Sequence, residues 1–310
     1  MQTAYLGRGE DLTDHDGLYK MLLHTFFREF MEAFFPEAAE AIDFGHVEFL
    51  SEEVVVDIAG GTKKRLDLLI KTRLKGEESF ILVHQEPQAY FQEAFAERMF
   101  IYSARLYEKH RLRVLPVAIF SHRQQSVEPD GFGWGLPSIE VLRFRFCTLQ
   151  LRKCNWKDYI RSVNPAVAAL LSSMGYNEEE KLQLKLEFLR MLTRMELNPA
   201  KLELLTVFFD AYLPLTPEEE QLVWQEVEAM SDKEEKKIME WKTHFQRYAM
   251  EEGMEKGMEA GLQKGLEQGR EKGRMEVAQR MIQEGLDPAL IAKLTGFTPE
   301  QIEQWKLQLH

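Results

Sequence analysis

Two short apolar runs separated by a glycine limit what this chain can fold into more than any other feature. Residues 65–73, "RLDLLIKTR", and 80–86, "FILVHQE", are rich in leucine, isoleucine and valine, and Gly76 lies between them. Runs of this length and composition predict β-strands, and the glycine predicts the turn that joins them. The second run ends on "HQEPQ" at 84–88. Carboxylates and amides cost free energy when they are buried, so this ending needs an explanation other than packing.

The neighbouring segments extend the two runs into a mixed sheet. Three further strands are predicted, at 47–58, 114–121 and, as one alternating strand, 139–151. Helices are predicted over 15–36, where Pro36 ends the apolar stripe, and over 91–110. This order predicts an α/β (α+β) fold with helices packed on a mixed sheet. The helix between strands 80–86 and 114–121 allows a right-handed crossover that makes them parallel.

The second half of the chain reads as helical from about Asn164 onward. Amphipathic segments punctuated by prolines predict a helical subdomain, which we interpret as a lid or docking surface. Glycines then recur every four residues from 253 to 273, and these six glycines cost a helix about 5 kcal/mol relative to alanine. Two interpretations stay open, a frayed helical linker and a helix held by self-association.

The last segment has the proportions of a helix-turn-helix. A helix is expected to end near Gly285, a second to follow Asp287 and Pro288, and a third to follow Thr298 and Pro299. Because few lysines are available to phosphate, packing or oligomer formation is an alternative to DNA reading. The expected organisation is a mixed-sheet domain at 1–161, a helical subdomain at 162–248, a glycine-repeat helical linker at 249–276 and a small helical segment at 277–310.

Charge is unevenly distributed along the chain. The net charge is −12, yet residues 61–161 carry 18 Lys and Arg against 11 Asp and Glu, a net of +7. A basic centre within an acidic protein fits a localised phosphate-contacting surface, although a solvated face that balances the acidic flanks is the plainer interpretation. The two cysteines, Cys147 and Cys154, are too few for a disulfide framework, and no segment predicts a membrane helix. We therefore expect a cytoplasmic protein that has no membrane partner.

Two carboxylates on neighbouring predicted strands are the best candidates for chemistry. If strands 65–73 and 80–86 are adjacent, Asp67 and Glu86 can lie side by side at one sheet edge. Converging carboxylates provide the hard oxygen ligands that Mg²⁺ or Mn²⁺ prefers. The alternative for Asp67 is an ion pair with Arg65 or Lys71, and for Glu86 a surface or capping role.

The order of these motifs resembles the PD-(D/E)XK nuclease superfamily and, more closely, the recombination-promoting nuclease family, whose members are often described as putative transposases. The matching stretches are "HDGLYK", "RLDLLIKTRL", "ILVHQEPQAY", "ERMFIYSARLYEKH", "LPVAIFSH" and the glycine-rich tail with "EGLDPALIAKLTGFTPEQIEQW". Nearly the whole chain is covered, although each motif is short. The resemblance implies a PD-(D/E)XK-like sheet and a metal-dependent DNA endonuclease that promotes recombination or element movement.

The resemblance also implies roles for individual residues. Asp67, Glu86 and the backbone carbonyl of Pro87 would bind Mg²⁺, or Mn²⁺ or Ca²⁺, and Asp16 would complete the acidic cluster from the first helix. The alternative for Asp16 is an N-cap of that helix. Gln88 stands where the superfamily usually has lysine; it can hydrogen-bond but carries no charge. The expected DNA contacts are Lys64, Arg65, Arg98 and Tyr102, although the last two are more often a surface arginine and a core tyrosine. The alternative function is a catalytically inactive nuclease-fold module that binds DNA or a protein, and the helical C-terminal half is a candidate for forming homo-oligomers.

Overall fold

The computed structural model describes residues 15–50, 68–86, 95–121 and 128–309. The chain divides into two compact units, Met1–Met239 and Glu240–His310. The finer division into four regions stays a prediction. Within the described residues, no helix is both long and apolar enough to cross a membrane.

A five-stranded mixed sheet forms the centre of the first unit, as the sequence predicts. Its strands lie in the order β1-β2-β3-β4-β7. Their bounds are β1 Glu48–Phe49, β2 Leu68–Leu74, β3 Glu77–Glu86, β4 Arg113–Phe120 and β7 Cys147–Gln150. β2 is antiparallel to β3, whereas β4 is parallel to both β3 and β7. The predicted parallel pairing across the intervening helix is therefore confirmed.

The turn between β2 and β3 is fixed by the backbone conformation of two residues. Lys75 and Gly76 both have positive φ, 50° and 85°. Two successive positive φ values are typical of the tight turns whose twist matches that of a β-hairpin. Glycine adopts this conformation without the steric cost that a side chain adds, which is why the glycine signal located the hairpin correctly.

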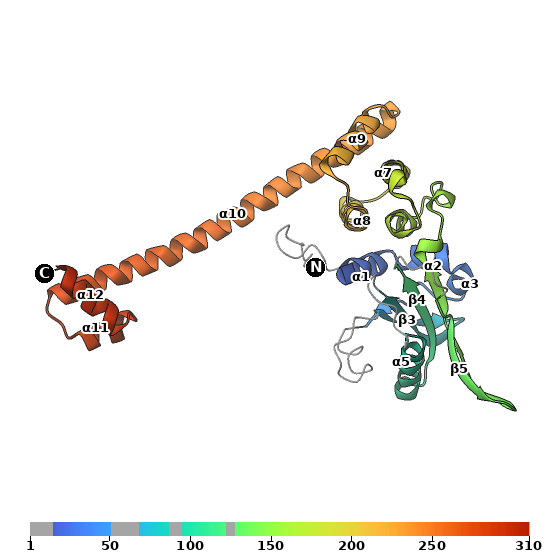
Figure 1. Cartoon of the computed structure of the whole chain (residues 1–310), viewed down its shortest axis with the longest axis horizontal. Helices are drawn as coiled ribbons and strands as arrows, with labels where there is room; N and C mark the ends of the chain where they lie inside the picture. Colours follow the sequence, from blue (N-terminus) through green and yellow to red (C-terminus); the bar gives the residue numbers. More distant parts are fainter. Residues whose placement is uncertain (1–14, 51–67, 87–94, 122–127, 310) are drawn as a thin grey trace. The chain divides into compact units, whose positions relative to one another are not determined.

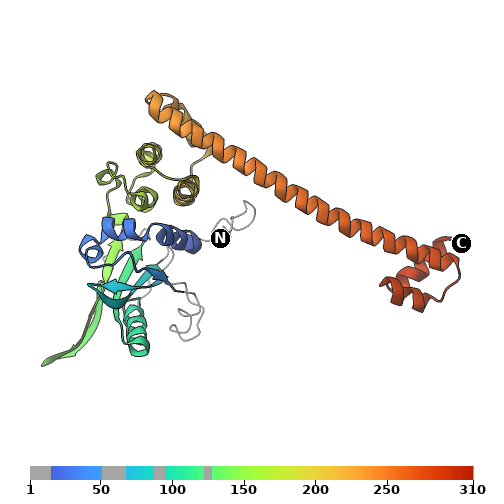
Figure 2. The same ribbon diagram turned by 180° about the vertical axis from the view of Figure 1, so that it is seen from behind.

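Helices cover both faces of the sheet. Figures 1 and 2 show α5, Phe95–His110, on one face and α1, His15–Thr25, with α2, Phe27–Phe34, on the other. On the α5 face, Tyr102 and Leu106 pack with Leu69, Phe80 and Leu82 of the sheet. Because residues two apart on a strand share a face, this cluster identifies the side of β2 and β3 that α5 covers.

The prediction of one helix over 15–36 is wrong. Phe26, with φ −127° and ψ 35°, separates α1 from α2. Pro36 ends α2 as expected, but it also begins the short helix α3, Pro36–Ala39, where a missing N–H costs nothing. The apolar stripe continues across the break because Phe26, Phe27 and Phe30 are all buried.

The prediction of one strand over 139–151 is also wrong. The segment divides at Phe146 into β6, Ile139–Arg145, and β7. β6 pairs with β5, Gly131–Leu136, a strand that the sequence analysis missed because three of its residues are glycine. At Phe146 the backbone N–H donates to the carbonyl of Asp130, and the chain passes from the β5–β6 ribbon to the edge of β4.

An all-helical region follows the sheet, as predicted. In the first unit it contains α6 Pro165–Leu170, α7 Lys181–Thr193, α8 Pro199–Tyr212 and α9 Pro217–Glu228. Asn164, Asn198 and Thr216 cap three of these helices through side-chain acceptors, each followed by proline at the first helical position. Each of these prolines begins a helix, which explains why prolines separate the amphipathic segments in the sequence.

The glycine repeat lies within a helix. α10 extends from Asp232 to Gln283, and it is followed by α11, Pro288–Thr295, and α12, Pro299–Leu309. Asp287 caps α11 by accepting from the N–H of Leu290, and Gly296 ends it with φ 74°. The expected turns at Gly285 and Gly296 and the start of both last helices are therefore confirmed.

Candidate functional site

The candidate site lies where several strands end together. Leu68, the first residue of β2, is opposite Val83 of β3. Glu86, the last residue of β3, is opposite Phe120, the last residue of β4, and Phe120 is in turn opposite Gln150 at the end of β7. One edge of the sheet thus contains the carboxyl ends of three parallel strands and the start of β2. In open α/β sheets, ligands commonly bind outside the carboxyl ends of the strands.

The predicted metal ligands fall only partly within the described residues. Asp67 directly precedes Leu68 in the sequence and lies outside those residues, together with Lys64, Arg65, Pro87 and Gln88. Glu86 ends β3 and Asp16 is the second residue of α1, but their side chains also lie outside the described part. The adjacency of the two strands, on which the prediction depended, is confirmed. The meeting of the two carboxylates stays a prediction.

The described residues contain no group of three or more His, Cys, Asp or Glu side chains that could hold a metal ion. Lys71, one of the two cations considered as partners for Asp67, lies 3.3 Å from the Glu78 carboxylate through its Nζ. Both side chains are exposed, and such pairs contribute little to stability.

Arg98 lies near this sheet edge through a chain of contacts on α5. The ring of Phe95, at the start of α5, is 5.0 Å from the ring of Phe120. The guanidinium carbon of Arg98 is 5.7 Å from the centre of the Phe95 ring. Since Phe120 is opposite Glu86, Arg98 belongs to the part of α5 that covers the end of β3.

Tyr102 lies one turn further along α5 and is 8% exposed in the core cluster. This burial leaves little of its surface for a phosphate. Its role as a DNA contact stays a prediction.

A buried hydroxyl cluster, which sequence reasoning missed, lies on α1. Tyr19 is three residues after Asp16 and is 1% exposed, and its hydroxyl donates to Ser173 Oγ at 3.4 Å. Burial raises the pKa of Tyr19 well above its ordinary value, whereas the hydrogen bond with Ser173 and the charge of Arg152 oppose this. The phenol is therefore neutral at physiological pH, and its hydrogen bond joins α1 to the segment that follows α6. Tyr19 is part of the quoted stretch "HDGLYK", but no local signal distinguishes it from a core tyrosine.

The second unit contains the helix-turn-helix segment. Ala278, Ile291 and Ile302 form its buried centre, one from each of α10, α11 and α12. Arg274 crosses the turn between the last two helices, donating through Nε to the carbonyl of Thr295 at 2.7 Å. Its guanidinium also lies over the ring of Phe297, 4.9 Å from the centre. The segment is therefore a small three-helix unit with its own core.

Comparison with known families gives one match. Residues 271–306 match the model described as the Rpn/YhgA-like nuclease family, C-terminal HTH domain. This range contains the end of α10, α11 and most of α12. An HTH domain suggests DNA binding. No curated protein and no solved structure was found that matches the chain.

Proposed function

We propose that this chain, which belongs to the Rpn/YhgA-like nuclease family, is a metal-dependent DNA endonuclease that promotes recombination or movement of a mobile element. The observation that carries the proposal is the β2–β3–β4 ladder. It brings the start of β2, which Asp67 precedes, to the same sheet edge as Glu86 at the end of β3. Two carboxylates close together could hold the metal ion that activates a water for phosphodiester hydrolysis.

Strand alternation supports a common face for the two carboxylates. Leu69 and Leu82 both face α5 in the core cluster. Asp67 is two residues before Leu69, and Glu86 is four residues after Leu82. Because side chains two apart on a strand share a face, we expect both carboxylates on the α5 side of the edge.

We propose that Asp67, Glu86 and the Pro87 carbonyl would hold Mg²⁺, with Asp16 completing the acidic cluster. Mn²⁺ or Ca²⁺ could take its place. Carboxylate and carbonyl oxygens are the donors that these hard cations prefer. When bound, the ion would lower the pKa of a water and offset the charge that develops on the phosphate.

The chain's own polar residues would orient the DNA. We propose that Gln88 positions the attacking water by a hydrogen bond, since its amide cannot supply the positive charge of a lysine. Arg98 would contact the phosphate from α5, Lys64 and Arg65 would contact the backbone beside Asp67, and Tyr102 would contribute its hydroxyl. Charged donors to phosphate form hydrogen bonds about twice as strong as neutral ones.

The test is cleavage of supercoiled plasmid by the purified protein with Mg²⁺ or Mn²⁺, beside Asp67→Ala and Glu86→Ala. The proposal predicts nicked or linear product from the wild type and a loss of at least about a hundredfold in each variant. Glu78→Ala, an exposed carboxylate at the far end of β3, is the matched control and should cut as the wild type does. Cutting that persists in both site variants would remove this site from consideration.

Gln88 favours a second candidate function. A site without the usual lysine charge can keep the nuclease scaffold and lose catalysis, which would leave a DNA-binding or protein-interaction module. A wild-type protein that binds the plasmid but cuts it with none of the metals would support this alternative.

We also propose that the helical C-terminal half holds copies of the chain together, in addition to the DNA binding that its HTH domain suggests. Met254, Met258, Leu262 and Leu266 of α10 are 59% to 74% exposed. Large apolar side chains that recur on an exposed helix are typical of an association surface. In this proposal residues 1–161 are the nuclease domain, 162–248 the helical subdomain, 249–276 the connecting helix and 277–310 the C-terminal segment.

A further inference from the structure

The β5–β6 ribbon projects from the sheet of the first unit (Figures 1 and 2). Its two strands form a separate two-stranded sheet. A two-stranded hairpin is only marginally stable in water unless something packs on it. The base of the ribbon has such contacts, whereas its outer part is exposed along both strands.

The base of the ribbon is anchored beside the candidate site. The rings of Phe132 and Phe144 each lie 5.6 Å from the ring of Phe100 on α5. Both also pack against the core cluster that includes Phe120. Because Phe120 is opposite Glu86 in the β3–β4 ladder, the ribbon and the candidate edge share one core cluster. A DNA duplex held at that edge would therefore lie within reach of the ribbon.

One face of the ribbon combines arginines with glycines. Arg145 is opposite Gly131, and Arg143 is opposite Gly133. Directly opposed residues of an antiparallel pair share a face, so the two arginine side chains leave the ribbon on the face of Gly131 and Gly133. Gly131 is required there, because a Cβ would lie 2.5 Å from the carbonyl oxygen of Phe144 and 3.1 Å from Cδ of Arg145.

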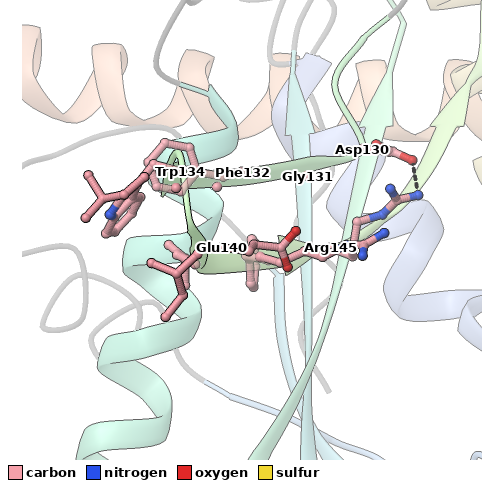
Figure 3. Close-up of a pocket in the computed structure, with 13 residues that line it drawn as sticks. Asp130, Gly131, Phe132, Trp134, Glu140 and Arg145 are labelled. Carbon is pink, nitrogen blue, oxygen red and sulfur yellow. Dashed lines mark hydrogen bonds and ion pairs between the residues drawn. The ribbon is translucent and has the colours of Figure 1, made fainter.

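Arg145 forms an exposed ion pair with Asp130. Its Nη2 donates to Oδ2 of Asp130 at 2.5 Å, and the two side chains are 62% and 54% exposed (Figure 3). Ion pairs this exposed contribute little to stability. Phosphate oxygens accept the same charge-assisted hydrogen bonds, and neutralising them releases counterions.

The tip of the ribbon is apolar. Leu136 and Ile139, which flank the turn at Pro137 and Ser138, are 65% and 59% exposed. DNA-binding proteins insert apolar side chains of this kind between base steps and so bend the duplex. Two-stranded ribbons bind DNA in either groove, and inserted apolar side chains are typical of proteins that bind the minor groove.

We propose that the β5–β6 ribbon is a DNA-binding arm, with Arg143 and Arg145 on phosphates and the Leu136–Ile139 tip against the bases of the same groove. This inference rests on the proposed nuclease function, because it takes the duplex at the sheet edge as its ligand. The ribbon, residues 131–145, carries two arginines against one glutamate, a net of +1, within the segment 61–161 that carries +7, and positive charge is complementary to DNA. A second copy of the chain is the competing occupant of an apolar tip, and the test separates the two.

The first arm of the test measures binding of a labelled duplex to the full chain by fluorescence anisotropy in EDTA, where no metal-dependent cleavage occurs. Arg145→Gln should weaken binding roughly tenfold and lower the slope of log K against log salt by about 1. Arg113→Gln is the matched control. Arg113 forms a similarly exposed ion pair with Glu77 at 2.6 Å. It is the first residue of β4, whereas Phe120, beside the candidate site, is the last.

The second arm replaces the tip by the double variant Leu136→Ser/Ile139→Ser. We expect roughly tenfold weaker binding with an unchanged salt slope, because no charge is altered. We also expect the variant to bend the duplex less, as measured by energy transfer between labels at the two duplex ends. Melting temperature and mass by light scattering should match the wild type, since both side chains are exposed.

Three results would overturn the proposal. The first is an equal loss of DNA affinity for Arg145→Gln and Arg113→Gln, and the second is no DNA binding by the wild type at low salt. The third is a tip variant that changes the oligomeric mass while it keeps the DNA affinity of the wild type. The last result would assign the tip to contacts between copies. A wild type that binds in EDTA with the predicted losses but never cuts plasmid would support the arm and remove the proposed enzymatic function.

Discussion

Apart from the β2–β3 hairpin, the strands of the first unit's sheet pair with strands far along the sequence, whereas the last helices of the second unit are bounded by residues next to them. β3 lies between β2 and β4, and Val83 is opposite both Leu68 and Val117. By contrast, α11 begins at its own cap, Asp287, and ends at its own glycine, Gly296. Local sequence signals therefore determine where α11 begins and ends, whereas tertiary contacts determine how the strands pair. We expect a destabilising substitution in one unit to leave the stability of the other unit unchanged.

The largest expected effect is the loss of the second unit on removing one core side chain. Ile302→Ala empties a fully buried position in a small core, whose other fully buried residues, among those that the structure describes, are Ala278 and Ile291. Truncating a buried isoleucine costs about 2 to 5 kcal/mol, which is comparable to the whole stability of a small helical unit. Hydrogen exchange should show α11 and α12 losing protection while β2, β3 and β4 keep theirs.

The control for this prediction is Leu307→Ala, also on α12, because Leu307 is 78% exposed. It should change stability by no more than about 0.5 kcal/mol. If Ile302→Ala also removed the protection of the sheet, the two units would not be independent.

A smaller effect is expected at the turn between α11 and α12. Gly296 has φ 74°, and a Cβ there would lie 2.8 Å from Nη2 of Arg274. Gly296→Ala should therefore cost about 1 kcal/mol for the left-handed conformation, and more if Arg274 loses its bond to Thr295. Thermal unfolding followed by circular dichroism measures this change.

Gly265→Ala in α10 is the matched control, since an added Cβ meets nothing within 4 Å. Alanine also favours a helix over glycine by about 1 kcal/mol. A stability loss at Gly265 as large as that at Gly296 would contradict this account of the turn.

The smallest effect is the acid dependence that Glu180 contributes to the first unit. Glu180 accepts from Lys157 Nζ at 2.5 Å and from the Asn177 N–H at 2.9 Å, which lowers its pKa to about 2. A depressed carboxyl pKa contributes stability that is complete above the ordinary value near 4.5 and is lost as pH falls through about 2. Denaturant titrations at a series of pH values should show this loss in the wild type.

Glu180→Gln should flatten the same pH dependence, because the amide does not titrate in this range. The protection of α11 and α12 at each pH should be the same in the variant and the wild type. An unchanged acid slope in the variant would show that other carboxylates govern the acid response of the first unit.

Much of the architecture could be predicted from the sequence, and the errors have physical causes. Gly76 and Asp287 are signals that act within a few residues, so the hairpin and the last helices were located correctly. The prediction of one strand over 139–151 overlooks two breaks in the alternation, at Val141–Leu142 and at Phe146–Cys147, and the chain changes partners at the second. β5 escaped detection because glycine has low strand propensity, although its glycines are needed where the strands of the ribbon approach closely.

The candidate site could be predicted only to the level of strands. The polar ending of strand 80–86 and the acid in "RLDLLI" predict two neighbouring carboxylates, and the ladder confirms that their strands are neighbours. The contact between Phe95 and Phe120, which brings α5 to this edge, joins residues 25 positions apart and has no sequence signal. The buried bond between Tyr19 and Ser173 spans 154 positions and could not be predicted either.

The most direct measurement of the central claim is a crystal structure of the full chain grown with Mn²⁺, read by anomalous scattering. The account predicts a peak between the carboxylates of Asp67 and Glu86 at the end of β3, with metal–oxygen distances of about 2.0 to 2.6 Å. Carboxylates more than about 8 Å apart, with no metal peak at this edge, would contradict it, because at such distances one ion cannot bridge them.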